Sequence, residues 1–220
     1  MKQLITRLSI ITSLLLLSSA TIGQTIKLDW VNTFGDIYDD KATDLTIDAQ
    51  GNIYVTGSFY GTVDFDPDTS TFTLTSGSNS DIYVLKLDTG GDLIWAKSII
   101  GARSQNITVN DSANVYISGI FLDRIDFDPG IGVFNLVGQG WIDAFILKLD
   151  SNGEFIWARS LTGSSRVFPQ SMAVDISGNL YLTGWFTDSV DFDPGPCEPI
   201  INNNLISSLV TNSNKYKRTN

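Results

Sequence analysis

Apolar and polar residues alternate in short runs along most of the chain, and turns rich in Asp and Gly separate these runs. Runs such as NIYVTGSF (52–59) and LIWAKSI (93–99) are rich in β-branched and aromatic residues, which is typical of β-strands. The connections DAQGN, DTGGD, DSNGE and DISGN begin with Asp and contain Gly, as tight hairpin turns do. The pattern predicts strands near 44–48, 52–59, 81–88 and 93–99, with a further short strand at FTLT (72–75) inside the insert 60–80.

The same set of strands occurs more than once. Residues 44–99 align with residues 106–161 without a gap, and 21 of the 56 positions are identical. A third copy begins at Ser171. A single four-stranded sheet cannot bury both of its faces, but stacked copies can, and radial stacking of such sheets produces a β-propeller. We therefore predict an all-β fold, a β-propeller-type array of four-stranded antiparallel blades.

The recurring motifs resemble those of a known family. QGNIYVTGSF (50–59), VDFDP (63–67), DIYVLKLD (81–88) and IWAKS (94–98), with their later copies, are similar to the SBBP-type β-propeller repeats of secreted bacterial proteins. The resemblance covers about residues 26–196. It implies a propeller fold and an exported or cell-surface location. Because that family shares no catalytic residues, the resemblance implies no reaction.

The array is predicted to be incomplete. LDWVNTFG (28–35) lies one period before LIWAKSIIG (93–101), which indicates a leading outermost strand. The array then amounts to about 2.5 blades, whereas closed propellers use about 4–8. An open blade edge of this kind predicts self-association. The predicted parts are a leading strand (26–35), blade 1 (44–101), blade 2 (106–163) and a partial blade 3 (171–196).

Residues 197–220 depart from the repeat pattern. They contain no copy of DIYVLKLD or IWAKS, and Asn is frequent after position 200. We interpret this segment as a divergent tail that is truncated or frame-shifted. Two alternatives stay open, an authentic disordered tail and a degenerate substitute for the third strand formed by NNLISSLV (203–210).

Residues 1–23 have the pattern of an export signal. Lys2 and Arg7 precede the apolar run LSIITSLLLL, and small residues follow, so we predict cleavage after Ala20 or Gly23. The apolar run is short for a membrane span. The expected product is extracellular or on the cell surface, with the periplasm as a further option and no membrane span after signal removal. A retained single-pass anchor is the alternative.

Composition narrows the chemistry. The 220 residues carry a net charge of −10, no His and one Cys, Cys197. The negative charge argues against nucleic acid as a partner. The lack of His removes the commonest general base, and a lone Cys cannot form an internal disulfide. We expect no enzymatic activity and no certain cofactor, and we expect a protein or polysaccharide ligand.

The recurring DFDP motif is the candidate metal site. Carboxylates at alternate positions around a sharp turn can wrap Ca²⁺, which takes six to eight oxygen ligands. The alternative is structural, with the first Asp of each motif bonding turn amides and the Pro setting the backbone angle. The candidate calcium ligands are Asp64, Asp66, Asp68, Asp126, Asp128, Asp191 and Asp193.

Aromatic and basic residues within the repeats have structural expectations. Trp141 and Trp185 have no Trp counterpart in the other copies, so each is either a variable core filler or an exposed sugar-stacking platform. Lys86 and Lys148 are expected to pair with neighbouring Asp residues. The aromatic residues expected to form the core between blades are Tyr54, Tyr116, Tyr181, Phe59, Phe121, Phe186, Trp95 and Trp157.

These observations predict a non-catalytic secreted or cell-surface protein that acts as a binding or structural scaffold. One alternative is a calcium-stabilised carbohydrate-binding module that uses the Asp loops and the unpaired Trp residues. A further alternative is a fragment of a propeller hydrolase or lyase.

Overall fold

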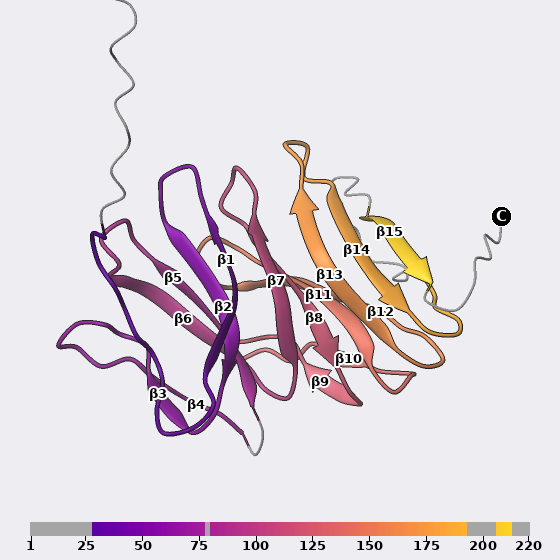
Figure 1. The fold of residues 1–220 in the computed structure, drawn as a ribbon, viewed down its shortest axis with the longest axis horizontal. Coiled ribbons are helices and arrows are strands. Elements are labelled where there is room, and N and C mark those ends of the chain that lie inside the picture. The colour runs from indigo at the N-terminus through magenta and orange to yellow at the C-terminus, as the bar shows by residue number, and fades with distance from the viewer. Residues whose placement is uncertain (1–27, 78–79, 193–205, 213–220) are drawn as a thin grey trace, which may run out of the picture. The chain divides into compact units, whose positions relative to one another are not determined.

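A computed structural model describes residues 28–77 and 80–192 together with the backbone of residues 206–212 (Figure 1). The described residues form strands and turns without a helix, as the all-β prediction requires. None of them belongs to a helix long and apolar enough to cross a membrane. The predicted export signal, residues 1–23, lies outside the described residues. The described residues from 32 onward belong to one compact unit, and residues 28–31 belong to a second unit.

Blades 1 and 2 have the same topology. Each is a four-stranded antiparallel sheet, with the order β1-β2-β5-β6 in blade 1 and β7-β8-β11-β12 in blade 2. The strands predicted from the alternation are confirmed. Their bounds are β1 (Lys41–Ile47), β2 (Ile53–Phe59), β5 (Asp81–Leu87) and β6 (Leu93–Ile99), then β7 (Arg103–Val109), β8 (Val115–Phe121), β11 (Asp143–Leu149) and β12 (Phe155–Leu161).

The insert between the second and third strands of each blade is itself a hairpin. In blade 1 it pairs β3 (Thr62–Asp64) with β4 (Thr73–Thr75), which confirms the short strand predicted at FTLT. In blade 2 it pairs β9 (Arg124–Asp126) with β10 (Asn135–Val137). The DFDP motifs begin at the ends of β3 and β9, so each motif turns the insert back on itself.

Blade 3 differs from the other two. It pairs β13 (Val167–Val174) with β14 (Leu180–Phe186), and β15 (Ile206–Asn212) takes the third position. β15 overlaps the segment considered as a third-strand substitute, but it runs parallel to β14. The antiparallel expectation holds for the two strands predicted for this partial blade, β13 and β14, and only the added strand β15 is parallel.

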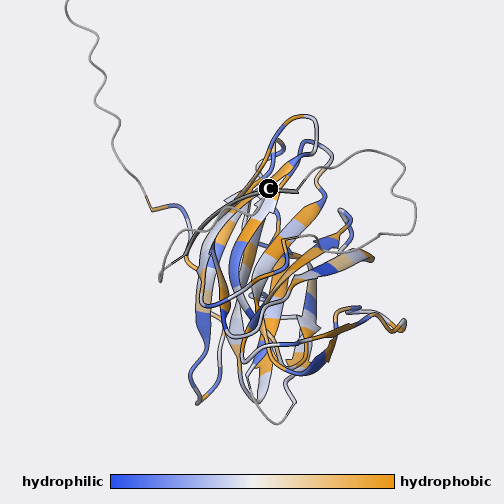
Figure 2. Ribbon diagram, turned by 90° about the vertical axis from the view of Figure 1, so that its right-hand side faces the viewer, coloured by the Kyte–Doolittle hydropathy of each residue, from blue (hydrophilic) through white to orange (hydrophobic). Residues whose placement is uncertain are grey.

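The blades stack in sequence order through their sheet faces, and hydrophobic and hydrophilic residues alternate along the strands (Figure 2). One apolar cluster lies between blades 1 and 2, a second lies between blades 2 and 3, and a third joins blade 1 to its own insert. Burying a large apolar side chain stabilises a fold by about 1.5–3 kcal/mol, so these clusters are the main source of stability. The largest fully buried side chains are Tyr54, Tyr116, Phe59, Phe65, Phe121, Phe127 and Phe145.

The expected aromatic core between blades is confirmed for Tyr54, Tyr116 and Phe121, which are buried completely or almost completely. Phe59 is also buried, but it packs against the insert of its own blade. Tyr181, which corresponds to Tyr54 in blade 3, is exposed instead. Its burial depends on a following blade, and the described residues contain none beyond blade 3.

The predicted leading strand is not a strand in the structure. Residues 28–35 have no strand assignment, and residues 26–27 lie outside the described residues. A strand requires a hydrogen-bonded neighbour, and no described segment lies beside this one as such a partner. The predicted register still holds. Asn32 Nδ2 donates to the Gly91 carbonyl at 2.7 Å, and Phe34 stacks on Phe65. One period later, β6 contacts the corresponding hairpin of blade 2.

The recurring glycine in the second strand has a steric cause. β1 and β7 each contain a bulge that pushes a carbonyl oxygen toward this position. A Cβ atom at Gly57 would collide with the Lys41 carbonyl, and one at Gly119 would collide with the Arg103 carbonyl. The glycine therefore serves the packing of the blade.

Candidate functional site

The first Asp of the DFDP motif closes the insert hairpin. Asp64 Oδ1 accepts hydrogen bonds from the backbone amides of Asp66 (3.1 Å) and Phe72 (2.9 Å). In blade 2, Asp126 Oδ1 accepts from the amides of Asp128 (3.1 Å) and Phe134 (2.8 Å). This arrangement is the structural alternative predicted from the sequence.

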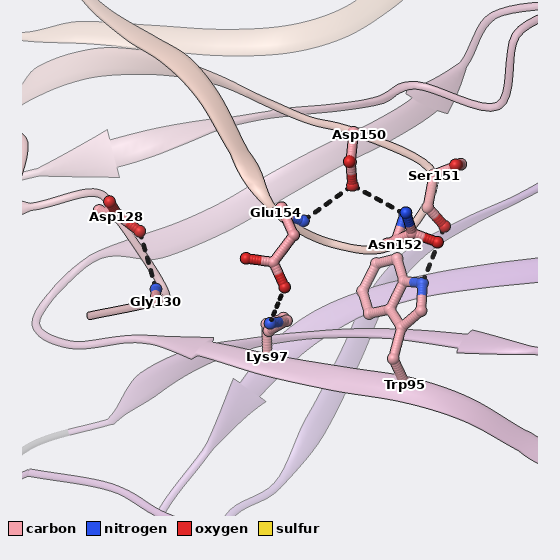
Figure 3. Close-up of polar contacts among 8 residues, drawn as sticks. All are labelled: Trp95, Lys97, Asp128, Gly130, Asp150, Ser151, Asn152 and Glu154. Carbon is pink, nitrogen blue, oxygen red and sulfur yellow. Dashed lines mark hydrogen bonds and ion pairs between the residues drawn. The ribbon is translucent and has the colours of Figure 1, made fainter. Parts of the chain in front are cut away.

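The second Asp caps the next turn, and the Phe between the two carboxylates points inward. Asp66 Oδ1 accepts from the Asp68 amide at 3.0 Å, and Asp128 Oδ1 accepts from the Gly130 amide at 2.8 Å (Figure 3). Phe65 and Phe127 are buried, and each makes an edge contact with the recurring Phe of the second strand. The motif is thus an apolar anchor between two turn-capping carboxylates.

The structure does not bring the candidate calcium ligands together into a metal-binding group. Among the described residues, no group of three or more Asp, Glu, His or Cys side chains is placed to hold a metal ion. Asp193 lies outside the described residues. Near the first motif, the charges of Asp68 and Asp88 raise the pKa of the exposed Asp92 above its ordinary value. Negative charge is therefore concentrated there, and calcium binding stays a prediction.

Two carboxylates at the start of the third strands are more deeply buried than those of the DFDP motifs. Asp81 accepts from the amides of Gly77 (2.7 Å) and Gly101 (3.0 Å). Asp143 accepts from Gln139 (2.7 Å), Gly140 (3.0 Å) and Gly163 (2.9 Å). Both side chains are almost completely buried. Each joins the insert to the end of the fourth strand. The sequence analysis missed them, although an Asp begins the third strand in both copies.

The hairpin between the first two strands contains a third carboxylate site. Asp48 Oδ1 accepts from the amides of Gln50 and Asn52, and Oδ2 accepts from Asn52 Nδ2 (2.8 Å) and the Tyr54 hydroxyl (3.1 Å). Burial opposes ionisation of Asp48, but the hydrogen bonds from Asn52, Tyr54 and Gln50 outweigh it, and the pKa lies below its ordinary value. The Asp48 carboxylate therefore links the turn to the strand that follows it, by accepting hydrogen bonds from both.

The same site is complete in blade 3 and incomplete in blade 2. In blade 3, Asp175 Oδ2 accepts from Asn179 Nδ2 (2.8 Å) and the Tyr181 hydroxyl (3.1 Å). In blade 2, Asn110 replaces the Asp, and its Oδ1 still accepts from turn amides. The buried Tyr116 hydroxyl has no hydrogen-bond partner within the described part of the chain.

The recurring lysines lie over aromatic rings, whereas the sequence analysis expected them to pair with neighbouring Asp residues. Lys86 Nζ lies 5.1 Å from the centre of the Tyr54 ring and donates to the Ser151 carbonyl. Lys148 Nζ lies 5.0 Å from the centre of the Tyr116 ring. A cation over an aromatic face is attracted by the ring quadrupole. Both lysines therefore cover a tyrosine ring of their own blade, and Lys86 also contacts the next blade.

Blade 1 contacts the outer hairpin of blade 2 through polar groups (Figure 3). Trp95 Nε1 donates to the Ser151 carbonyl at 3.1 Å, and Lys97 Nζ pairs with Glu154 at 2.9 Å. Asp150 Oδ1 shapes this hairpin by accepting from the amides of Asn152 and Glu154. The contact fixes the register of one blade on the next.

The two unpaired tryptophans have different environments. Trp185 is half-buried and stacks on Phe168 with ring centres 4.4 Å apart. Trp141 is 71% exposed, so the core-filler interpretation is wrong for it. Its backbone amide donates to the Ser165 carbonyl at 2.7 Å, and the Arg166 guanidinium lies 5.7 Å from its ring centre. Trp141 is therefore an exposed aromatic side chain beside a cation.

Comparison with known proteins agrees with the repeat architecture. A family model described as SBBP, a beta-propeller repeat, matches residues 156–190, which extend from β12 through β14. The resemblance predicted from the motifs is confirmed by this match. An uncharacterized WD repeat-containing protein of Acanthamoeba polyphaga mimivirus is 28% identical over 121 residues, covering 47% of this chain and 9% of that protein. The chain thus matches only a small part of that relative's length. Both comparisons support a propeller-repeat scaffold.

Proposed function

We propose that this chain is an exported, non-catalytic β-propeller-repeat scaffold that binds its ligand through the insert of blade 2. The observation that carries the proposal is how the recurring carboxylates are used. Asp48, Asp64, Asp81 and their counterparts accept backbone amides that shape turns and inserts. Residues that recur therefore build the scaffold, and ligand recognition is left to exposed residues that do not recur.

The non-catalytic part of the proposal has support from the same hydrogen bonds. A hydrolase that uses two carboxylates needs one to donate a proton and the other to attack or to activate water. In the DFDP motifs, Asp64 and Asp66 are each engaged by backbone amides within their own turn. The pair also recurs in blade 2 with the same bonds, as expected for a structural element of the repeat.

The insert of blade 2 is the best candidate for a binding surface. It exposes Ile131, Val133 and Trp141, whereas the corresponding positions of blade 1 are Thr69, Thr71 and Asn79. Trp141 is the distinctive residue. Its backbone amide is bonded to the Ser165 carbonyl, its ring is exposed, and a guanidinium beside the ring supplies hydrogen-bond donors. An apolar ring next to polar donors suits the apolar face and hydroxyls of a sugar, so we propose a polysaccharide ligand.

Affinity electrophoresis of the full chain in gels containing different soluble polysaccharides tests this proposal. We expect at least one polysaccharide to retard the wild type, and Trp141→Ala to abolish the retardation. Ile176→Ala, which truncates an exposed apolar side chain of blade 3 outside the insert, is the matched control and should keep the retardation. If no polysaccharide slows the wild type, or if Trp141→Ala behaves like the wild type, the proposed ligand class is wrong.

Calcium stabilisation is a separate prediction with its own test. The concentration of negative charge around Asp92 would be relieved by a bound cation. Calcium should then raise the melting temperature relative to EDTA, and the double variant Asp64→Asn with Asp66→Asn should lose this rise. Equal melting temperatures in calcium and in EDTA would refute the prediction without affecting the polysaccharide proposal.

A further inference from the structure

We infer that the polysaccharide bound at Trp141 is negatively charged, and that Arg166 binds its anionic groups, which are the carboxylate of a uronic acid or a sulfate ester. This inference rests on the proposed function, because it names the class of polysaccharide for the same site. Three features without a counterpart in blade 1 meet there. They are the Trp141 ring, a three-residue insertion that contains Arg166, and a glycine that gives the insertion room.

The connection between blades 2 and 3 is three residues longer than the connection between blades 1 and 2. In both connections a glycine donates its amide to the buried Asp of the third strand, Gly101 in the first and Gly163 in the second. Gly101 is followed directly by the buried Ala102, whereas residues 164–166 separate Gly163 from the buried Val167. Residues 164–166 are therefore an insertion into the repeat.

One side of the insertion is bonded to the end of the blade 2 insert. The Ser165 carbonyl accepts the amides of Trp141 (2.7 Å) and Ile142 (3.2 Å), and the Ile142 carbonyl accepts the Val167 amide at 2.9 Å. A Cβ atom at Gly140 would collide with the Ser165 carbonyl oxygen, and blade 1 has a serine at this position. The glycine therefore allows the close approach that places the insertion beside Trp141.

The other side of the insertion is bonded to the segment that follows β14. The Ser164 amide donates to the Ser189 carbonyl at 3.0 Å, and the hydroxyls of these two serines lie 2.9 Å apart. The Arg166 amide donates to the Thr187 hydroxyl at 3.2 Å, and the Arg166 carbonyl accepts the Thr187 amide at 2.9 Å. The Arg166 backbone is thus fixed before a ligand binds, which lowers the entropy cost of binding.

The Arg166 guanidinium has no anionic partner among the described residues. It lies 5.7 Å from the centre of the Trp141 ring, and no described carboxylate lies within ion-pair distance of it, in contrast to Lys97, which pairs with Glu154. Arginine presents five N–H donors in a planar fork that fits the oxygens of an anionic group such as a carboxylate. A charged sugar therefore supplies what Arg166 lacks, and charge-assisted hydrogen bonds are stronger than bonds to the hydroxyls of a neutral sugar.

Biolayer interferometry of the full chain on immobilised polysaccharides tests the inference with pairs that share a backbone and differ in charge. The pairs are polygalacturonate with its methyl-esterified form, and dextran sulfate with dextran. We expect the wild type to bind the charged member of at least one pair about tenfold more tightly than the neutral member, and the pair that shows this tells carboxylate from sulfate recognition. Arg166→Gln should remove the preference and leave the affinity for the neutral member within about twofold. Trp141→Ala should weaken binding to both members.

A matched control separates the contact at Arg166 from the overall charge of the protein. Lys41→Gln removes an exposed cation of blade 1 and should keep the wild-type preference, because the chain as a whole carries a net charge of −10 and does not attract polyanions. Equal binding of the charged and neutral members, or a preference that survives Arg166→Gln, would overturn the inference and leave the proposed function standing. A wild type that binds no polysaccharide at all would refute the proposed function, and this inference with it.

Discussion

Blades 1 and 2 build their first hairpin in the same shape from different side chains. In blade 1, one oxygen of Asp48 accepts the turn amides and the other accepts the Tyr54 hydroxyl. In blade 2, Asn110 accepts the turn amides, and the Tyr116 hydroxyl is buried with no partner in the described part of the chain. The turn therefore needs only one side-chain oxygen, whereas anchoring the tyrosine needs the second oxygen of a carboxylate.

In blade 1 a single residue, Asp48, accepts both the turn amides and the tyrosine hydroxyl, whereas in blade 2 only the first of these roles is kept. The side chains of Asn110 and Asn114 each carry an amide NH₂ group, where blade 1 has a carboxylate and an amide. The ring of Tyr116 nevertheless keeps its packing against Trp157 and Lys148. Blade 2 thus retains the apolar part of the site and lacks its polar part.

The largest expected effect concerns the buried carboxylates at the start of the third strands. Asp143 accepts the amides of Gln139, Gly140 and Gly163. Asp81 accepts the amides of Gly77 and Gly101, and the blade 1 counterpart of Gly140 lies outside the described residues. Removing a buried acceptor leaves its donors unsatisfied, at a cost of about 1–3 kcal/mol for each buried group. We expect Asp143→Ala and Asp81→Ala each to lower the free energy of unfolding by about 2–3 kcal/mol in urea titrations.

The matched control for these two variants is Asp111→Ala, which removes an exposed carboxylate of blade 2. It should change the free energy of unfolding by less than about 0.5 kcal/mol. A loss from Asp81→Ala or Asp143→Ala no larger than that from Asp111→Ala would show that the buried amide bonds do not set the contribution of these carboxylates.

Removing the tyrosine hydroxyl should change the free energy of unfolding differently in the two blades, with a difference of about 1 kcal/mol. Tyr54→Phe loses the hydrogen bond to Asp48, so we expect it to destabilise the protein by about 1 kcal/mol. Tyr116→Phe removes a buried hydroxyl without a partner, and we expect no loss of stability or a small gain. Urea unfolding of both variants measures the difference. Equal losses would mean that Tyr116 has a partner after all.

The pH dependence of stability should distinguish the same two hairpins. The pKa of Asp48 is lowered in the folded state, so its contribution is present above the ordinary carboxyl pKa of about 4 and is lost as the pH falls toward the folded value. The wild type should therefore exceed Asp48→Asn in stability at pH 7, and the gap should narrow at about pH 3. Asn110→Ala is the control, since its effect should not change with pH in this range. A gap of constant size would contradict the assignment.

The smallest effect is expected for the contacts at the outer strands. Lys97 pairs with the partly exposed Glu154, whereas its counterpart Arg159 lies over the Trp157 ring. Exposed ion pairs contribute about 0–1 kcal/mol and are screened by salt. Lys97→Gln should cost about 0.5 kcal/mol or less, with the effect declining in high salt. Arg159→Gln should show a weaker dependence on salt, and a reversed order would contradict the pairing.

Strand positions and turns were predictable because they depend on local sequence. The alternation in NIYVTGSF and the Asp-Gly turns specify strands and hairpins without reference to distant residues. The structural interpretation of DFDP was available for the same reason, since Asp64 contacts amides within its own insert. The match of residues 156–190 to a propeller repeat likewise follows from motifs visible in the sequence.

Features that depend on a neighbouring blade or a missing one were not predictable. Tyr181 has the same local sequence context as Tyr54, and only the absence of a covering blade in the described structure exposes it. Lys86 was expected to pair with Asp, but its cation lies over a ring and reaches a carbonyl of blade 2. The parallel direction of β15 was not predictable, because its segment has none of the repeat motifs from which strand directions were inferred.

The central claim is that the recurring polar residues stabilise the repeat through hydrogen bonds. Blade 2 lacks one of these bonds, because Asn110 stands where blade 1 has the carboxylate that accepts the tyrosine hydroxyl. A double-mutant cycle measures it directly, with urea unfolding at pH 7 of the wild type, Asn110→Asp, Tyr116→Phe and the double variant. Asn110→Asp should raise the free energy of unfolding of the otherwise wild-type protein by about 1 kcal/mol. It should give no such gain in the Tyr116→Phe background, because the new hydrogen bond to the carboxylate needs the Tyr116 hydroxyl. An equal effect of Asn110→Asp in both backgrounds would contradict the claim.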